Sequence, residues 1–473
     1  MRTAFHTLAA AAVFAAATTS ALNLQKRSDG FAPRVVQHDI QRRRPDNPIE
    51  HDRSRMAKRA GTVQVDLENE ETLYYMEVKI GTPEQTIKLH LDTGSSDLWV
   101  NVADSSLCSS NNDVCADSGT YNANKSDTYN YINSDFKITY VDGSGSSGDY
   151  VTDVVKFSNI TLESQQFGIG YQSTSQEGIL GIGYPVNEVA LSNGGKKYAN
   201  VPQNMLDNGL ISTNSYSLWL NDLEASTGSI LFGGVNEAKY TGDLYTLPIL
   251  KESGEYAEFF IALTAIGANG DNGTIASDVA IPALLDSGSS LMYLPDNITQ
   301  KIYDATNSQY NSDQGAAFVD CNLAKAAGSL DFTFSGPTIR VDLSELVIEA
   351  GTDSNGDKVC ILGIGPAGDS ASVLGDTFIR SAYIVYDLTN NEISIAQTNF
   401  NTAEDNILEI TNSTGVPSAT VVQNAVTSVS VSESNGARIN DQGTVTVSDF
   451  AAPTAAVGYT GLAAVAAVAA FVL

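Results

Sequence analysis

A short acidic phrase that occurs twice constrains the fold of this chain more than any other feature. Residues 90–97 read HLDTGSSD, and residues 284–291 read LLDSGSSL. In both phrases an apolar residue precedes the aspartate, then Thr or Ser, a glycine and two serines follow. One such phrase arises easily by chance in 473 residues, but two copies with the same continuation indicate a repeated structural unit.

Each phrase is followed at the same distance by a second part of the repeat. Gly181 closes the tripeptide ILG 89 residues after Asp92, and Gly375 closes VLG 89 residues after Asp286. Residues 60–405 show no long helical periodicity, and short β-type runs such as YYMEVKI and AYIVYDL are broken by Gly, Asn and Asp. The chain is therefore expected to be mostly β, with two related lobes that each contribute one aspartate on a tight turn.

Two aspartates held side by side can hydrolyse a bond without a metal or a cofactor, and none is expected here. Like charges this close cannot both ionise, so the pair shares one proton. One carboxylate acts as a base on water, while the protonated partner polarises the scissile carbonyl group. The catalytic candidates are therefore Asp92 and Asp286.

The other residues of each phrase have matching supporting roles. The glycines let backbone N–H groups approach the carboxylates, the residue after each aspartate can bond across the junction of the two turns, and the first serine can hold an outer carboxylate oxygen. In that order the candidate pairs are Gly94 and Gly288, Thr93 and Ser287, and Ser95 and Ser289.

Other hydrolytic chemistries lack their residues in this chain. The four histidines are His6, His38, His51 and His90, and the first three lie in segments that we expect to be removed. The single histidine left in the mature part argues against a Ser-His-Asp triad and against a histidine-rich zinc site. His90 lies two residues before Asp92 on an expected strand, and we interpret it as a buried structural residue.

The cysteines and the glycosylation sequons agree with secretion. Four cysteines allow three pairings, and the local pairing, Cys108–Cys115 with Cys321–Cys360, closes the shortest loops and is preferred. With all four paired, no thiol is left for nucleophilic catalysis. Five sequons mark candidate N-glycosylation sites: Asn124, Asn159, Asn272, Asn297 and Asn412.

The N-terminal region is expected to be removed in two steps. Residues 1–21 have the layout of a signal peptide. Residues 22–59 hold ten basic and five acidic residues and are expected to form a propeptide, with Arg42–Arg44 as its charge centre over an acidic cleft. The dibasic pair Lys58-Arg59 is the predicted cleavage site for a secretory convertase.

The mature part is strongly acidic. The whole chain has 26 Lys and Arg against 55 Asp and Glu, and residues 60–473 hold 15 basic and 50 acidic residues. Nucleic acid is therefore not expected as a partner, because both molecules would carry negative charge.

The C-terminal region has the layout of a GPI-attachment signal. Residues 406–435 are interpreted as a stalk, since ten of the 24 residues from 411 to 434 are Ser or Thr. Small residues, a polar spacer and an apolar tail follow, which favours attachment at Asn435 and removal of residues 436–473. A tail that spans the membrane is the alternative. We expect a protein on the extracellular face of the plasma membrane or in the cell wall.

Residues 60–405 resemble the pepsin-family aspartic proteases, most closely the fungal yapsin and candidapepsin branch. The resemblance rests on the segments HLDTGSSDLWV, ITYVDGSGSSG, EGILGIGYP, GSILFGGVNEAKYTG, LLDSGSSLMYLP and SVLGDTFIRSAYIVYD. It implies a bilobal β fold with an N-terminal lobe at 60–242, a C-terminal lobe at 243–405 and a cleft between them. It also implies a monomeric aspartic endopeptidase that acts on proteins or peptides through Asp92 and Asp286.

The resemblance further implies a flap that closes over the substrate. Tyr140 matches the flap tyrosine, Trp99 matches the tryptophan that hydrogen-bonds it, and Asp142 and Gly143 follow in the flap. Several fungal relatives carry an aspartate at the position of Asp142, where it receives a Lys or Arg side chain N-terminal to the scissile bond. Asp142 could instead only shape the hairpin turn. Val141 departs from the family, which usually has glycine there, and predicts a stiffer flap.

Two other interpretations are weighed against an active protease. A glycoside hydrolase also uses two carboxylates, but it does not require the repeated turns. A catalytically inactive peptide-binding protein, or a structural protein of the cell wall, would keep the same fold.

Overall fold

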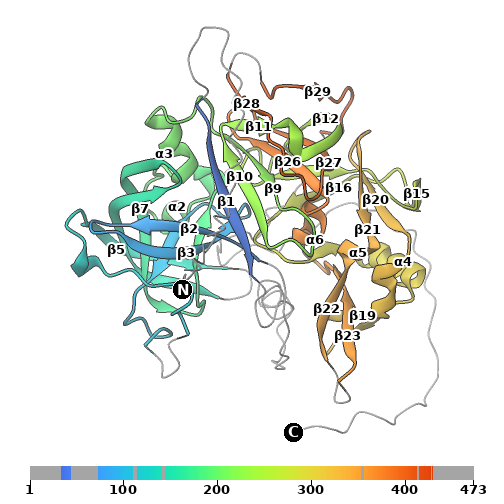
Figure 1. Ribbon diagram of the computed structural model, residues 1–473, viewed down its shortest axis with the longest axis horizontal. Helices are drawn as coiled ribbons and strands as arrows, with labels where there is room; N and C mark the ends of the chain where they lie inside the picture. The colour runs from blue at the N-terminus through green and yellow to red at the C-terminus, as the bar shows by residue number, and fades with distance from the viewer. Residues whose placement is uncertain are drawn as a thin grey trace, which may run out of the picture.

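Strands dominate the structure, a computed structural model that describes residues 34–43, 73–109, 114–140, 144–352, 356–412, 415–427 and 429. The strands form two lobes joined by a shared sheet, as Figure 1 shows with the first lobe in blue to green and the second in yellow to orange. The predicted mostly β, bilobal architecture is confirmed.

The first lobe is a sheet that closes on itself. Its strands pair in the order β2-β3-β8-β4-β7-β6-β5, and an additional pairing of β2 with β6 completes a ring. The strands are β2 (Leu73–Ile80), β3 (Gln85–Asp92), β4 (Leu98–Asn101), β5 (Asn130–Thr139), β6 (Gly145–Phe157), β7 (Ile160–Ser173) and β8 (Gly178–Gly181).

The shared sheet continues from β2 and joins the lobes. Its order is β29-β12-β27-β26-β9-β10-β1, and β1 then pairs with β2 of the first lobe. The strands are β1 (Val36–Arg43), β9 (Ser215–Trp219), β10 (Thr227–Phe232), β12 (Tyr240–Pro248), β26 (Ala382–Asp387), β27 (Glu392–Thr398) and β29 (Ala419–Val421). A separate pair consists of β11 (Gly234–Asn236) and β28 (Ile407–Glu409).

The second lobe consists of three smaller sheets. The first contains β13 (Phe260–Leu263), β16 (Ile281–Leu285), β25 (Ser372–Leu374), β17 (Met292–Leu294) and β24 (Ile364–Pro366). The second contains β15 (Asp271–Ala276), β14 (Ala265–Ala268), β20 (Ser329–Thr333) and β21 (Thr338–Asp342). The third contains β18 (Gln309–Asn311), β19 (Ala316–Val319), β23 (Lys358–Leu362) and β22 (Val347–Thr352).

Helices are short and lie between the strands. The α-helices are α2 (Val189–Ser192), α3 (Val201–Asp207), α4 (Asp296–Thr306), α5 (Leu343–Leu346) and α6 (Asp376–Ile379). The 3-10 helices are η2 (Ala123–Lys125), η3 (Pro185–Asn187), η4 (Glu237–Lys239) and η5 (Cys321–Lys325). In the described part of the chain, no helix has the length and apolar character needed to cross a membrane.

The equal spacing in the sequence corresponds to equal strand pairing in the two lobes. In the first lobe β3 pairs in parallel with β8, β8 pairs antiparallel with β4, and β4 pairs in parallel with β7. In the second lobe β16, β25, β17 and β24 repeat these three pairings with the same directions. The apolar-apolar-Gly strand therefore lies beside the aspartate strand in both lobes.

Strand β1 was not foreseen, because the basic segment that contains it was expected to cover the cleft. Val36–Gln41 pair with β10, and Arg43 is the register partner of Leu73 in β2. Val36 and Ile40 are buried in the main hydrophobic core. Two of the three arginines proposed as a charge centre thus belong to a strand of the shared sheet, and Arg44 and the Lys58-Arg59 site lie outside the described residues.

The body of the protein also extends beyond the predicted boundary at 405. Ile407–Glu409 form β28, Ala419–Val421 form β29, and Val422 and Val426 pack against the main core. The start of the expected solvated stalk was therefore placed too early. Asn435 and residues 436–473 lie outside the described residues.

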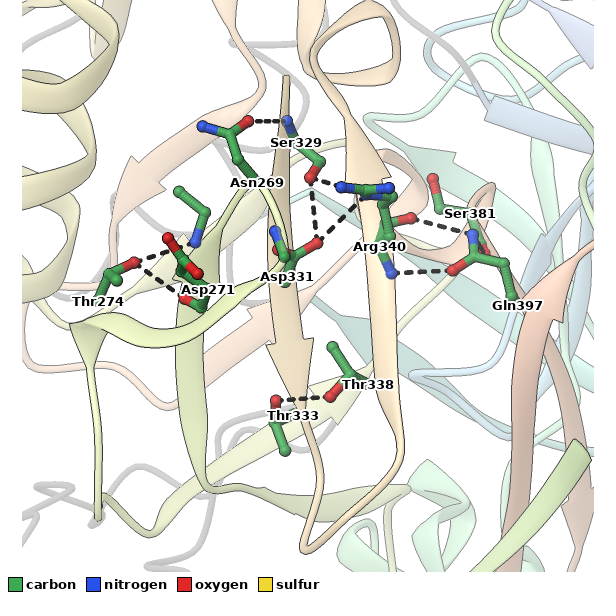
Figure 2. Close-up of polar contacts among 12 residues, drawn as sticks. Asn269, Asp271, Thr274, Ser329, Asp331, Thr333, Thr338, Arg340, Ser381 and Gln397 are labelled. Carbon is green, nitrogen blue, oxygen red and sulfur yellow. Dashed lines mark hydrogen bonds and ion pairs between the residues drawn. The ribbon is translucent and has the colours of Figure 1, made fainter. Parts of the chain in front are cut away.

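Hydrogen bonds connect the second sheet of the second lobe to the shared sheet, as Figure 2 shows. The Gln397 amide of β27 accepts from the Arg340 backbone N–H at 2.9 Å and donates to the carbonyl groups of Arg340 and Ser381 at 3.0 and 2.9 Å. The Arg340 guanidinium lies 3.5 Å from Asp331 Oδ1 on the neighbouring strand. The Gln397 contacts hold β21 against β27.

The structure contains both preferred disulfides, Cys108–Cys115 and Cys321–Cys360. The five sequon asparagines are all exposed, which leaves each of them accessible to a glycan: Asn124, Asn159, Asn272, Asn297 and Asn412.

Candidate active site

Asp92 ends β3, and the turn after it supplies donors to both oxygens of its carboxylate. The backbone N–H of Gly94 donates to Oδ1 at 2.8 Å, and the Ser95 hydroxyl donates to Oδ2 at 2.5 Å. Each donor favours the ionised form of the carboxylate locally. The side chain is fully buried, so these bonds compensate for lost hydration.

Asp286 follows β16, and its turn repeats the arrangement. The Gly288 backbone N–H donates to Oδ1 at 2.8 Å, and the Ser289 hydroxyl donates to Oδ2 at 2.7 Å. The side chain is 4% exposed. The two aspartates thus have the same pair of donors, as the repeat in the sequence predicts.

The residue after each aspartate connects the two turns. The Thr93 hydroxyl donates to the Leu285 carbonyl at 2.9 Å and accepts from the Ser287 N–H at 2.9 Å. The Ser287 hydroxyl donates to the Leu91 carbonyl at 2.9 Å and accepts from the Thr93 N–H at 3.2 Å. Four reciprocal bonds therefore fix the lobes to each other at the site.

The Asp286 carboxylate lies close to the turn that carries Asp92. A methyl group added to Gly94 would lie 2.5 Å from Asp286 Oδ1 and 2.8 Å from its carboxyl carbon. No real side-chain carbon tolerates such a contact, so glycine is required at this position. The Asp286 carboxylate thus lies directly against the Asp92 turn, and the two acidic groups form one site.

The closing glycines of the repeat allow the aspartate turns to pack on their neighbouring strands. A methyl group on Gly181 would lie 2.6 Å from the backbone nitrogens of Ser96 and Asp97. On Gly375 it would lie 2.3 Å from the carbonyl oxygens of Ser289 and Leu291. The apolar-apolar-Gly pattern is explained by this close backbone approach.

His90 is a buried structural residue, as expected, and it lies next to the junction. Its Nε2 is 3.3 Å from the Ser287 carbonyl oxygen, and its ring packs against that of Tyr75 with centroids 5.8 Å apart. Because a carbonyl oxygen only accepts, Nε2 carries the proton in this contact. The side chain is 2% exposed.

Tyr140 and Trp99, which the resemblance assigns to the flap and its hydrogen-bond partner, are in contact. Tyr140 directly follows β5, and its hydroxyl accepts a hydrogen bond of 2.7 Å from Trp99 Nε1 in β4. Both side chains are buried. Val141, Asp142 and Gly143 lie outside the described residues.

A pair of buried carboxyl groups near the Trp99–Tyr140 contact was not predicted from the sequence. Asp97 and Glu188 are both fully buried, although they are far apart in the sequence. One signal was present, because the first phrase ends in Asp97 where the second ends in Leu291. No group of three or more residues suited to hold a metal occurs among the described residues.

Duplicated β lobes that each present one aspartate on an Asp-Thr/Ser-Gly turn define the class of pepsin-like aspartic proteases. The family profile for eukaryotic aspartyl proteases matches residues 73–398, and this chain belongs to that family.

Curated relatives are similar over most of their length. The probable aspartic-type endopeptidase opsB of Aspergillus oryzae is 53% identical over 429 residues, which cover 89% of this chain and 87% of the relative. Aspartic proteinase yapsin-3 of Saccharomyces cerevisiae is 36% identical over 386 residues, covering 78% and 74%. The chain is an aspartic-type endopeptidase of the yapsin-like fungal group.

A solved structure supports the fold. The aspartic proteinase from Irpex lacteus superposes with a TM-score of 0.60 at 23% identity, and the match covers 78% of this chain and all of the other. This likeness concerns architecture alone.

Proposed function

We propose that the protein is a secreted, cell-surface aspartic endopeptidase in which Asp92 and Asp286 together activate water. The observation that carries this proposal is the reciprocal junction between the turns, which brings together two equivalently hydrogen-bonded aspartates and sets the Asp286 carboxylate against Gly94 of the other turn. Such a pair retains one shared proton, because placing two like charges this close is unfavourable.

The proposed reaction uses that proton. The ionised carboxylate removes a proton from water as the water oxygen bonds to the scissile carbonyl carbon. The protonated carboxyl gives its proton to the carbonyl oxygen at the same time. Collapse of the tetrahedral intermediate breaks the C–N bond as one of its hydroxyl groups returns a proton to the ionised carboxylate and the leaving amine takes a proton from the protonated carboxyl, so the dyad regains its single shared proton. Ser95 and Ser289 hold the outer oxygens, so the inner Oδ1 atoms are directed towards the substrate.

Digestion of an unfolded protein tests this assignment. The processed protein is incubated with denatured globin at acid pH, with and without pepstatin, and new termini are identified by mass spectrometry. Internal cleavage that pepstatin blocks is expected. Binding of the substrate without cleavage would identify an inactive relative instead.

The location is proposed from segments outside the described residues. A signal peptide at 1–21 and a GPI signal with attachment at Asn435 would place the enzyme on the extracellular face of the plasma membrane or in the cell wall. Phosphatidylinositol-specific phospholipase should release it from cells, and truncation after Ser434 should secrete it freely. Failure of both treatments would favour a spanning tail.

Latency is proposed from the basic segment at 22–59, removed by a secretory convertase at Lys58-Arg59. Strand β1, which belongs to this segment, pairs with β2 and β10 and so ties the segment to the folded protein. Lys58→Ala with Arg59→Ala should leave a secreted zymogen that is slow on peptides. Full activity of the uncut form would refute the proposal.

A preference for Lys or Arg before the scissile bond is proposed from charge. Asp142 follows Tyr140 by two residues, and the mature part carries an excess of acidic residues that attracts basic peptides. Asp142→Ser should lose about 1–3 kcal/mol in kcat/KM for a Lys peptide and little for its Leu counterpart. Equal losses on both peptides would show that Asp142 only supports the flap.

A further inference from the structure

A cluster of aromatic residues carries the Trp99–Tyr140 hydrogen bond, and two buried carboxyl groups lie on its far side. Tyr150 of β6 packs edge-on against Phe136 of β5, with ring centroids 5.3 Å apart, and Phe136 packs against Trp99 at 6.5 Å. Val189 of α2 is buried in the same cluster. The position of Tyr140 therefore depends on what holds β6 and α2 in place.

Asp97 holds both elements. Its Oδ2 accepts the backbone N–H of Val189 at 2.9 Å, which fixes the first turn of α2. Its Oδ1 accepts the Tyr198 hydroxyl at 2.8 Å and the Tyr150 hydroxyl at 3.4 Å. Asp97 follows Asp92 by five residues, so the same short segment carries a catalytic candidate and this anchor.

Glu188 completes the anchor from the other end of the segment. Its Oε2 accepts the Tyr198 backbone N–H at 2.8 Å, which closes the chain from 188 to 198 into a loop over the cluster. Its Oε1 is buried and has no hydrogen-bond partner among the described residues. An ionised carboxylate in this place would leave a charge uncompensated in an apolar environment.

We propose that Asp97 and Glu188 are positioning residues for the flap, and that their uncharged form keeps Trp99 and Tyr140 in place. This inference rests on the proposed protease function and on the flap role that the family resemblance implies for Tyr140. When the pair ionises, repulsion and desolvation loosen the 188–198 loop, the aromatic cluster shifts, and substrate binding weakens.

The pKa directions agree with this geometry. Burial raises the pKa of Asp97 to about 6, and the hydrogen bonds from Val189 and Tyr198 limit the rise. Burial also raises the pKa of Glu188 to about 9, and the charge of Asp97 adds to it. The other titratable groups facing the pair are Lys197, whose attraction for Glu188 lowers that pKa, and the hydroxyls of Tyr150 and Tyr198, while Asp135 acts on Tyr150 from the outer side of β5.

The sign of the pH dependence follows from these directions. Both folded-state pKa values lie above those of the unfolded chain, so the stabilisation is complete below about pH 4. It is lost as the pH rises, first between about pH 4 and 6 through Asp97 and then towards pH 9 through Glu188. The flap should therefore loosen on the neutral side.

The chain offers a direct reporter, since Trp99 and Trp219 are its two tryptophans. In a Trp219→Phe background, Trp99 emission and the KM for a peptide are measured in the processed protein from pH 4 to 9. We expect emission to change and KM to rise near pH 6, with kcat less affected. Asp97→Asn should abolish the change near pH 6 and leave only the later change towards pH 9 that Glu188 causes, because Asn stays neutral and keeps an oxygen for the Val189 N–H.

Controls separate this inference from the protease assignment. Asp149→Asn removes a more accessible carboxylate of β6 that bonds Ser134 and Tyr171, and it should leave the midpoint unchanged. In an Asp92→Asn background, Trp99 emission still reports the pair without any catalysis. Should Asp97→Asn not fold, Glu188→Gln should instead abolish the emission change towards pH 9. The inference is overturned if Asp97→Asn keeps the emission change near pH 6, or if Glu188→Gln keeps the change towards pH 9.

Discussion

At the scale of single residues, the site depends on two hydroxyl groups that each donate and accept. The Thr93 hydroxyl makes two hydrogen bonds to the backbone of the opposite lobe, and the Ser287 hydroxyl makes two to the backbone of the first lobe. These roles could be predicted from the sequence because aspartate, hydroxyl residue, glycine and serine are neighbours in the chain, and the turn sets their geometry. The Asp97–Glu188 pair could not, since only tertiary packing brings these residues together.

Removing the Thr93 hydroxyl should loosen the junction. In Thr93→Val the Leu285 carbonyl and the Ser287 N–H lose their shared partner, which costs about 1–3 kcal/mol for each buried group left unpaired. Urea denaturation and kcat on a peptide measure the two consequences. Thr93→Ser keeps the hydroxyl and serves as the matched control. If Thr93→Val is as stable and active as Thr93→Ser, the junction has no such role.

At the scale of elements, β1 shows how composition can hide a strand. Val36 and Ile40 point into the core with the alternation of a half-buried strand, yet the basic residues around them favour a propeptide interpretation. Both descriptions apply, because a removable segment can also pair in a sheet. The strands after residue 405 were missed for a similar reason, since a Ser/Thr-rich composition outweighed a few apolar positions such as Ile407 and Val422.

His38 should make the docking of β1 depend on pH. Its ring packs edge-on against Phe157, and burial lowers its pKa, although the charges of Asp39 and Glu77 oppose this. The neutral form is thus favoured in the docked strand, and docking should weaken as the pH falls below about 6.5. After cleavage at Lys58-Arg59, gel filtration and mass spectrometry should find residues 34–43 retained better at pH 7 than at pH 5.

The variant His38→Gln isolates this effect from other titrating groups. It cannot change its charge, so the difference in retention between pH 7 and pH 5 should shrink. An equal pH dependence in His38→Gln and the parent would show that β1 docks independently of His38.

The two disulfides should differ in their contribution to stability. Cys321–Cys360 closes a loop with a sequence separation of 39, against 7 for Cys108–Cys115. In the chain-entropy model, replacing Cys321 and Cys360 with alanines should lower the free energy of unfolding by about 4 kcal/mol. The same change at Cys108 and Cys115 should lower it by about 2.5 kcal/mol. Denaturant unfolding of the two double variants checks the order, and a larger loss for the short loop would contradict it.

At the scale of the whole molecule, a duplicated lobe surrounds one site while a shared sheet joins the halves. The duplication could be predicted because the 89-residue spacing reflects the same strand pairing in both lobes. The shared sheet could not, since its strands come from distant parts of the chain and carry no repeat. The catalytic function needs both features, because each lobe supplies half of an acid–base pair that acts only when held together.

The most direct test of this account is the activity of Asp92→Asn, Asp286→Asn and the double variant on one peptide. Each single change removes half of the proton-sharing pair, so each should lower kcat by about 100-fold or more while circular dichroism stays unchanged. The double variant should lose little more than either single one, because residues that act as a unit are not additive. Activity near that of the parent in either single variant would contradict the shared site.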